Sequence, residues 1–233
     1  MSNPALLSRG FALLFPPGVI AAELREPGRV ELLLPEEAAG LGRAVQERRQ
    51  EFAAGRLCAR RALAELKIVD FAVIAQPDRQ PRWPATVVGS ITHTAGLCAA
   101  VAGLRSRFVG LGLDTEIAER VSAELSLRIC VEAELAWIDS LPAVQRAGAA
   151  ALVFAAKEAF YKCQSPVTGQ WLGFKDLGIE PADFDAALRQ GAVDTFRIIP
   201  SRPMALTALT STPLAGRYRF HEEFVSAGVA VEA

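Results

Sequence analysis

The segment from about Ala147 to Cys163 has the residue spacing of a helix but almost no polar side. Its only charged side chains belong to Lys157, Glu158 and Lys162. We expect this helix to be mostly buried, where charges need a partner, a metal ion or a phosphate. Glu158 and Lys162 lie one turn apart, so they can also be an ordinary pair of neighbouring charges worth about 0.2 to 0.5 kcal/mol. The structural and the functional interpretation both stay open.

The size and composition of the chain are those of a globular protein. It has 233 residues, of which 51% are hydrophobic and 22% charged, values that exclude wholesale disorder and coiled coil. A chain of this size buries about 70% of its unfolded surface, so disulfide bonds are unnecessary. The four cysteines are scattered and form no Cys-x-x-Cys pair. We expect reduced thiols in a cytoplasmic protein.

Charge and hydropathy argue against two classes of partner. The 25 basic and 26 acidic residues leave a formal net charge of −1, which argues against a nucleic-acid surface. The longest apolar stretches are about half of the roughly 20 residues that a transmembrane helix needs. We therefore expect neither nucleic acid nor membrane as a partner, and any anion site must be local.

The segment Val109–Glu116 alternates apolar residues with glycines and acids. In a strand, Gly110, Gly112, Asp114 and Glu116 share one face. Two carboxylates about 7 Å apart on a strand can reach one hard cation, and Mg²⁺ binds carboxylate, water and phosphate oxygens. The glycines would let a ligand approach the backbone closely. The alternative is a strand end that runs into a solvated acidic turn.

Arginines gather in a helix expected from about Pro35 to Leu66, with an interruption near Gly40 and Gly42. Guanidinium groups can hold a phosphate through paired hydrogen bonds. The alternative is a solvated face in which Glu47 and Glu51 are local partners. The cluster consists of Arg48, Arg49, Arg56, Arg60 and Arg61.

His93 ends an apolar run in the segment 86–102, where we expect a strand, a turn and a second strand. No second histidine or cysteine lies at ligand spacing, so a hydrogen bond to a phosphate or hydroxyl suits His93 better than zinc. His221 lies in a charged context and is expected at the surface. The common phosphate-loop, dinucleotide and hydrolase motifs do not occur.

A weak internal echo suggests that the chain contains two related halves. Phe52–Ala54 and Phe154–Ala156 have the same three residues, and each lies in an expected helix that precedes a β-rich region. Three shared residues are meagre evidence, because alanine-rich helices match by chance. The break would fall near Ser106.

Five short motifs follow one another along the chain: Arg48–Phe52 with Arg56, Arg79–Pro84, Gly89–His93, Gly112–Glu116 and Lys157–Lys162. Their order and spacing resemble those of the 4'-phosphopantetheinyl transferases, of the surfactin-synthetase or enterobactin type. The resemblance runs from about residue 43 to 180. Members of this family move the 4'-phosphopantetheine arm of coenzyme A to a serine of a carrier protein.

The resemblance implies a role for each motif. Asp114, Glu116 and Glu158 would bind Mg²⁺ at the diphosphate of coenzyme A. Glu158 would also be the general base for the carrier serine. Lys157 and Lys162 would contact the phosphates, and in catalysis they would offset charge on the leaving oxygen. The residues that would hold the nucleotide and its 3'-phosphate are Arg48, Arg56, Arg79, Thr92 and His93.

The same resemblance implies an α+β fold of two similar αβ subdomains, residues 1–106 and 107–233, in a pseudo-twofold arrangement with the cofactor between them. It implies a monomer that modifies apo acyl, aryl or peptidyl carrier proteins and releases adenosine 3',5'-bisphosphate. Such carriers serve siderophore, polyketide, nonribosomal peptide and fatty-acid synthesis. Two other functions stay open. One is Mg²⁺-dependent hydrolysis of a nucleotide or diphosphate by the same acids. The other is binding of carrier proteins or nucleotides without chemistry, in which Glu158 and Lys162 would be a structural pair.

Overall fold

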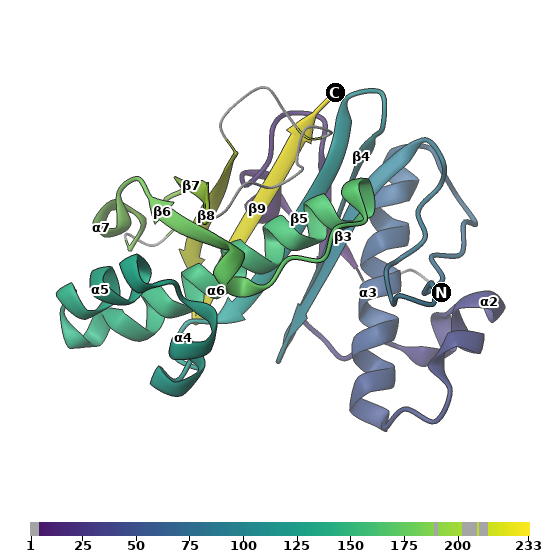
Figure 1. Ribbon diagram of the computed structural model, residues 1–233. Helices are drawn as coiled ribbons and strands as arrows, with labels where there is room; N and C mark the ends of the chain where they lie inside the picture. The colour runs from purple at the N-terminus through teal and green to yellow at the C-terminus, as the bar shows by residue number, and fades with distance from the viewer. Residues whose placement is uncertain (1–4, 189–190, 202–208, 210–213) are drawn as a thin grey trace.

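The computed structural model describes residues 5–188, 191–201, 209 and 214–233, and it contains both helices and strands (Figure 1). In chain order they are β1 (Leu6–Leu7), α1 (Arg9–Ala12), β2 (Ile20–Leu24), α2 (Pro35–Ala38), α3 (Gln46–Glu65), β3 (Val87–Thr94), β4 (Leu97–Leu104), β5 (Phe108–Ile117), α4 (Ala123–Ile129), α5 (Glu132–Ser140), α6 (Ala143–Thr168), β6 (Leu177–Pro181), α7 (Phe184–Ala187), β7 (Asp194–Pro200), β8 (Ala215–His221) and β9 (Phe224–Glu232). Short 3₁₀ turns lie at Val30–Leu32, Ala39–Leu41 and Phe174–Asp176. The fold class is α+β, as the family resemblance implied.

Two antiparallel sheets divide the chain. The first has the strand order β1-β2-β4-β3, and α3 packs on β2 and β4. The second has the order β5-β9-β8-β7-β6, and α6 lies across β5 and β9 (Figure 1). The first sheet therefore ends at Leu104 and the second begins at Phe108.

The two sheets meet where β3 lies against β5. No backbone ladder joins these strands among the described residues, and two hydroxyl groups on β3 take its place. Ser90 Oγ accepts a hydrogen bond from the backbone N–H of Leu113 at 3.0 Å, and Thr92 Oγ1 accepts one from the N–H of Thr115 at 3.0 Å. Both hydroxyls are buried, so the junction satisfies polar backbone groups that water cannot reach.

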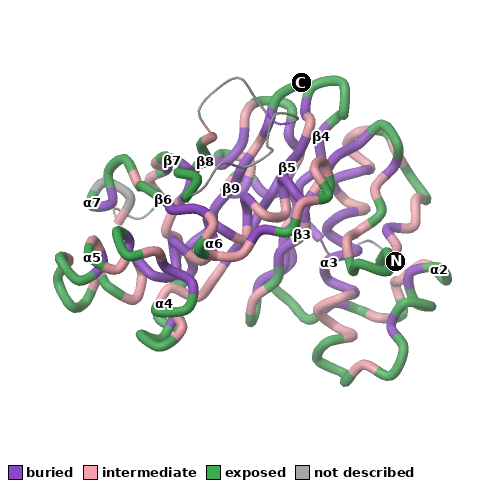
Figure 2. The backbone as a smooth tube through the Cα atoms, in the orientation of Figure 1, coloured by how far each residue is buried: buried purple, intermediate pink, exposed green. Residues whose placement is uncertain are grey.

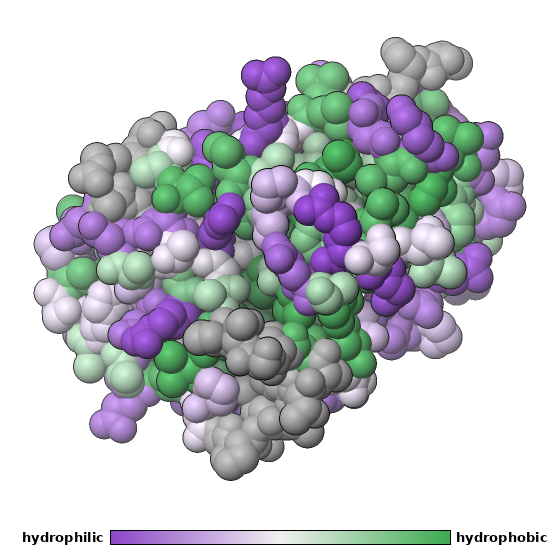
Figure 3. Space-filling model, turned by 90° about the horizontal axis from the view of Figure 1, so that it is seen from above, coloured by the Kyte–Doolittle hydropathy of each residue, from purple (hydrophilic) through white to green (hydrophobic). Residues whose placement is uncertain are grey.

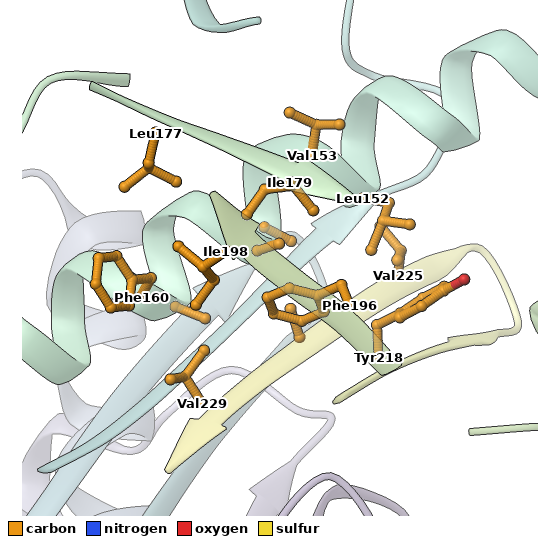
Figure 4. Close-up of a cluster of buried hydrophobic side chains, with 14 of the residues drawn as sticks. Leu152, Val153, Phe160, Leu177, Ile179, Phe196, Ile198, Tyr218, Val225 and Val229 are labelled. Carbon is orange, nitrogen blue, oxygen red and sulfur yellow. The ribbon is translucent and has the colours of Figure 1, made fainter. Parts of the chain in front are cut away.

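The largest core lies between α6 and the second sheet. Figure 4 shows Phe160 from α6 near Ile198 from β7, and Leu152 near Val225 from β9. Most of α6 and of the central strands is correspondingly buried (Figure 2). The predicted burial of this helix is confirmed, although it runs from Ala143 to Thr168 and includes Pro166 in its last turn.

Most predicted elements are present with shifted ends. The helix expected over 35–66 is interrupted as predicted, because α2 ends at Ala38, a 3₁₀ turn follows and α3 begins at Gln46. The strand, turn and strand expected over 86–102 are β3 and β4. No helix in the described ranges combines the length and hydropathy of a membrane span. The face shown in Figure 3 mixes hydrophilic and hydrophobic residues over short distances.

Candidate active site

Strand β5 presents Asp114 and Glu116 beside α6, and its glycines make this possible. A methyl group on Gly112 would lie 1.8 Å from the carbonyl oxygen of Ala159, and one on Gly110 would lie 2.6 Å from that of Cys163. The expectation that these glycines admit a ligand is therefore wrong. They admit the backbone of α6, which carries Glu158 and Lys162 to the acidic end of the strand.

Asp114 is the best-defined acid of the site. It is only 5% exposed. Its Oδ1 accepts hydrogen bonds from Lys162 Nζ at 2.6 Å and from Thr92 Oγ1 at 3.1 Å. Its Oδ2 is buried and has no hydrogen-bond partner. A buried carboxylate oxygen without a donor costs free energy, so this atom is suited to a cation.

The other two acids, Glu116 and Glu158, have raised pKa values. Burial, followed by the charge of Asp114, raises the pKa of Glu116 to about 7, with Glu158 acting in the same direction. Burial also raises the pKa of Glu158, against the charge of Lys162 and with that of Asp114. Burial would lower the pKa of Lys162, but the three acids outweigh it and the pKa is raised. The acids thus repel one another around a single ammonium group.

This donor set fits a hard divalent cation. Mg²⁺ prefers carboxylate oxygens and retains water or phosphate oxygens as further ligands. Asp114 offers a buried oxygen without a donor, and Glu116 and Glu158 are acids whose charges a cation would stabilise. Within the described ranges, no three His, Cys, Asp or Glu side chains lie together so that they could hold a metal ion as they stand. Lys162 Nζ holds Asp114 Oδ1 instead.

His93 and Arg48 lie beside each other on the side of the first sheet. Arg48 Nη1 is 2.7 Å from His93 Nε2 and 3.1 Å from Glu51 Oε2. Partial burial lowers the pKa of His93, and the charge of Arg48 acts in the same direction against that of Glu51. Because the guanidinium can only donate, Nε2 is the acceptor and the ring is neutral. Both side chains are exposed enough to turn toward an anion.

The other predicted nucleotide-binding arginines differ in their surroundings. Arg56 is buried, lies 3.7 Å over the ring of Phe52 and donates from Nε to the carbonyl of Val73 at 3.0 Å. Burial lowers its pKa to about 10. Arg79 is exposed at the tip of a turn, in the left-handed region with φ of 69°. Arg56 is thus held inside the protein, whereas Arg79 is open to solvent.

The arginine cluster does not form a single phosphate-facing stripe. Arg60 pairs with the buried Glu37 and donates to the carbonyl of Leu32 at 2.6 Å. Arg61 pairs with Glu65 at 2.6 Å. Both arginines are therefore used within the protein.

The predicted phosphate contact of Lys157 needs correction. The side chain is 2% exposed. Its ammonium donates to the carbonyls of Ile129 and Phe174, each at 2.8 Å, and to Glu134 Oε2 at 2.7 Å. An ammonium has three donors, and all three are taken. Lys157 reaches no phosphate without breaking this network.

A cavity of about 190 Å³ opens beside Glu158. Its wall is mainly apolar, and Trp171 on its rim is 74% exposed. Sequence reasoning did not single out Trp171 or Tyr161 as a wall of the site, because an isolated aromatic residue has no recognisable pattern. The lining residues are Lys157, Glu158, Tyr161, Trp171, Leu172, Gly173, Phe174 and Leu177.

Comparison with known proteins matches both halves of the chain to one family. Residues 36–103 match the 4'-phosphopantetheinyl transferase N-terminal domain, and residues 110–202 match the 4'-phosphopantetheinyl transferase superfamily. The chain is 32% identical to the 4'-phosphopantetheinyl transferase Npt of Nocardia iowensis over 93% of its own length and 97% of that protein. It is 38% identical to PptT of Mycobacterium tuberculosis over 63% of its own length and 64% of that protein. Enterobactin synthase component D of Salmonella typhi is 35% identical, with 52% of this chain and 50% of that protein covered. The resemblance found in the motifs is thus confirmed over nearly the whole sequence, and the chain belongs to the 4'-phosphopantetheinyl transferase superfamily.

Proposed function

We propose that this enzyme transfers the 4'-phosphopantetheine arm of coenzyme A to a serine of an apo carrier protein and releases adenosine 3',5'-bisphosphate. One observation carries the proposal. Asp114 pairs with Lys162 at the end of β5, near enough to Glu116 and Glu158 for their charges to interact, and Glu158 also lines a largely apolar cavity. Acids that hold a divalent cation suit a diphosphate, and an apolar cavity suits the aliphatic arm attached to that diphosphate.

Asp114, Glu116 and Glu158 would hold Mg²⁺ in this enzyme. A bound Mg²⁺ would neutralise the diphosphate and so favour its attack by a nucleophile. The unpartnered Oδ2 of Asp114 supports this assignment.

Glu158 would be the general base. It lines the cavity, and burial raises its pKa, which makes its carboxylate a better proton acceptor. The proton of the carrier serine passes to Glu158, and the serine oxygen bonds to the phosphorus that carries the pantetheine. The bond from that phosphorus to the bridging oxygen breaks, and the electron pair leaves with adenosine 3',5'-bisphosphate. Lys162 would offset the negative charge that develops on the leaving oxygen.

The nucleotide would lie against the first sheet. Arg48 and His93 are exposed, adjacent cation and imidazole groups, and such a pair suits the 3'-phosphate. Thr92 is the residue before His93 and already contacts Asp114. Arg56 and Arg79 would complete the nucleotide site.

One chain supplies both sides of this site, which supports a monomer. Thr92 and His93 come from the first sheet, and Asp114 and Lys162 come from the second half. The four cysteines are free and buried, which supports an assignment to the reducing cytoplasm.

The decisive experiment measures the mass of a carrier protein. The enzyme is incubated with coenzyme A, Mg²⁺ and a panel of apo acyl, aryl and peptidyl carriers, with a carrier whose acceptor serine is alanine as the control. We expect the intact carrier to gain one phosphopantetheine arm and the control to gain none. Nucleotide release without a carrier would instead indicate a hydrolase, and nucleotide or carrier binding without transfer would indicate a binding module.

The proposed metal site has its own test. Asp114→Ala removes the buried oxygen without a donor, so we expect weaker Mg²⁺ binding by calorimetry in the presence of coenzyme A. Unchanged affinity for Mg²⁺ would contradict the assignment of Asp114.

A further inference from the structure

Glu134 is the centre of a buried network behind the site. It is 3% exposed and lies in the first turn of α5. Its Oε2 accepts from the N–H of Val131 at 2.7 Å and from Lys157 Nζ at 2.7 Å, and its Oε1 accepts from the N–H of Ile179 at 2.6 Å. One carboxylate therefore connects the start of α5, strand β6 and helix α6.

The first half of the chain contains the same network. Glu37 lies in the first turn of α2 and is fully buried. It accepts from the N–H of Leu34 at 3.0 Å and from that of Val73 at 3.0 Å, and it pairs with Arg60 of α3. The acid and the cation are 23 residues apart in both halves.

Four positions of the two networks correspond, and only the second backbone donors, Val73 and Ile179, lie at a different spacing. Arg60 donates to the carbonyl of Leu32 as Lys157 donates to that of Ile129. The matching residues keep a constant offset of 97: 32 with 129, 34 with 131, 37 with 134, and 60 with 157. Arg60 and Lys157 are therefore equivalent supports, and the buried position of Lys157 is part of a repeated design.

The two cations differ in one contact. Lys157 has a third acceptor, the carbonyl of Phe174 at 2.8 Å, and the described part of the chain shows no third acceptor for Arg60. Phe174 lines the cavity, and the residue after Lys157 is Glu158. The contact that only the second half has thus joins the cavity wall to the helical turn that carries Glu158.

We propose that Lys157 is a positioning residue that holds the wall of the cavity, through Phe174, against the turn of α6 that carries Glu158. This inference rests on the proposed function, in which the cavity receives the pantetheine arm. Lys157 then acts on the arm and on catalysis without touching a phosphate. Burial lowers the pKa of Lys157, against the charge of Glu134, and the ion pair keeps the ammonium charged.

The test is the replacement Lys157→Arg, which copies the cation used by the first half. Arginine can reach Glu134 and the carbonyl of Ile129, as Arg60 reaches its own partners, but its fork is not matched to the three converging acceptors of an ammonium. We expect a similar melting temperature and unchanged calorimetric affinity for adenosine 3',5'-bisphosphate. We expect affinity for coenzyme A, and kcat at saturating coenzyme A, to fall about tenfold, which corresponds to about 1.4 kcal/mol.

A second variant removes the charge of Lys157 altogether. Lys157→Met alone would leave Glu134 buried and unpaired, so Glu134→Gln and Lys157→Met are combined. We expect this double variant to keep its affinity for adenosine 3',5'-bisphosphate and to lose affinity for coenzyme A. The matched control is Arg60→Lys in the first half. It should not lower the affinity for coenzyme A relative to that for adenosine 3',5'-bisphosphate.

Two results would overturn the proposal. A loss of affinity for adenosine 3',5'-bisphosphate as large as that for coenzyme A in the double variant would mean that Lys157 binds phosphate. A Lys157→Arg enzyme with wild-type affinities and kcat would mean that the contact with Phe174 positions nothing. The affinity comparison needs no turnover, so it can fail while the wild-type enzyme transfers the arm, and absent transfer by the wild type would count against the proposed function alone.

Discussion

Individual side chains at this site are defined by what they lack as much as by what they contact. Asp114 has one oxygen with two donors and one with none, whereas Lys157 has every donor satisfied. Both residues belong to short charged motifs that look alike in the sequence. The first keeps one oxygen without a donor, whereas the second is fully used within the fold, and this difference depends on partners distant in the chain.

Replacement of Glu158 by Gln tests the proposed base. The amide keeps the shape of the side chain but accepts no proton, so we expect transfer to fall by about 10² to 10⁴-fold. Removal of a partly desolvated carboxylate should leave the fold intact, which a circular dichroism melting curve checks. Full turnover by a folded Glu158→Gln enzyme would show that another group removes the proton.

His221 predicts a pH dependence of stability. The expectation of a surface residue is wrong, because the ring is half-buried and its Nε2 lies 2.8 Å from Ser226 Oγ. Burial lowers its pKa to about 4, as do the charges of Arg219 and Arg25, against those of Glu222 and Glu23. The unfolded state, with a pKa near 6.5, therefore takes up a proton first as the pH falls.

The contribution of His221 to stability should be complete above about pH 6.5 and should be lost progressively toward about pH 4. Replacement by Gln, which keeps a hydrogen bond to Ser226 possible, should flatten this part of the pH dependence. Urea unfolding of the wild type and of the His221→Gln variant between about pH 4 and 6.5 measures the free energy of unfolding that decides this. If the free energy of unfolding depended on pH in the same way in both proteins, groups other than His221 would set that dependence.

Secondary-structure elements could be predicted better than their contacts. The helix around 147–163 was evident from its apolar residues, and the strand at 109–116 from its alternation, because both patterns are local. The need for glycine at position 112 could not be predicted from its neighbours in the sequence. Its partner is the backbone of Ala159 on another element, and a sequence shows which residues are small without showing what approaches them.

The packing of α6 on β5 predicts a large effect at Gly112. An added methyl group would overlap the carbonyl of Ala159 at 1.8 Å, and such overpacking costs about 1 to 3 kcal/mol or more. Gly112→Ala should therefore lower the free energy of unfolding and separate Lys162 from Asp114, with loss of transfer. Denaturant unfolding and the carrier assay measure the two effects.

Gly148→Ala in α6 is the matched control for this change. Its methyl group would make an ordinary contact with Phe220 at 3.4 Å, and alanine favours a helix over glycine by about 1 kcal/mol. It should leave stability unchanged or raise it. Equal destabilisation by both changes would argue against the close approach at Gly112.

The internal echo was recognised at the wrong register. Phe52–Ala54 and Phe154–Ala156 are 102 residues apart (52 and 154), whereas the buried networks correspond at 97 (37 and 134). Shared small residues were a poor guide, because any alanine-rich helix provides them. An acid in the first turn of a short helix, followed by a cation 23 residues later, is the pattern that indicates the correspondence between the two halves.

At the scale of the whole molecule, the candidate site depends on the junction between the two sheets. The predicted boundary at residue 106 stays a prediction, and the described sheets lie on either side of it. Thr92 crosses this junction, because it accepts from the N–H of Thr115 and donates to Asp114. The sequence placed Thr92 in a motif, but only the packing of β3 on β5 shows this double role.

Replacement of Thr92 by Val tests the junction. It keeps the shape of the side chain but leaves the N–H of Thr115 buried without an acceptor, at a cost of about 1 to 3 kcal/mol. It also releases Asp114, so transfer should fall as well. Ser90→Ala removes only hydrogen bonds to the backbone of Leu113 and should destabilise the protein with less effect on transfer. Equal activity losses in the two variants would contradict the link to Asp114.

The offset of 97 also relates the charged residues that follow Arg60 and Lys157 on the two long helices. Arg61 corresponds to Glu158 and Glu65 to Lys162, so the order of the charges is reversed between the halves. The buried ion pairs Arg60–Glu37 and Lys157–Glu134 are thus compatible with either order of charges in the residues that follow them. Exchange of Arg61 and Glu65 would give α3 the same order of charges as the proposed catalytic turn of α6, above the buried Arg60–Glu37 pair that is already present.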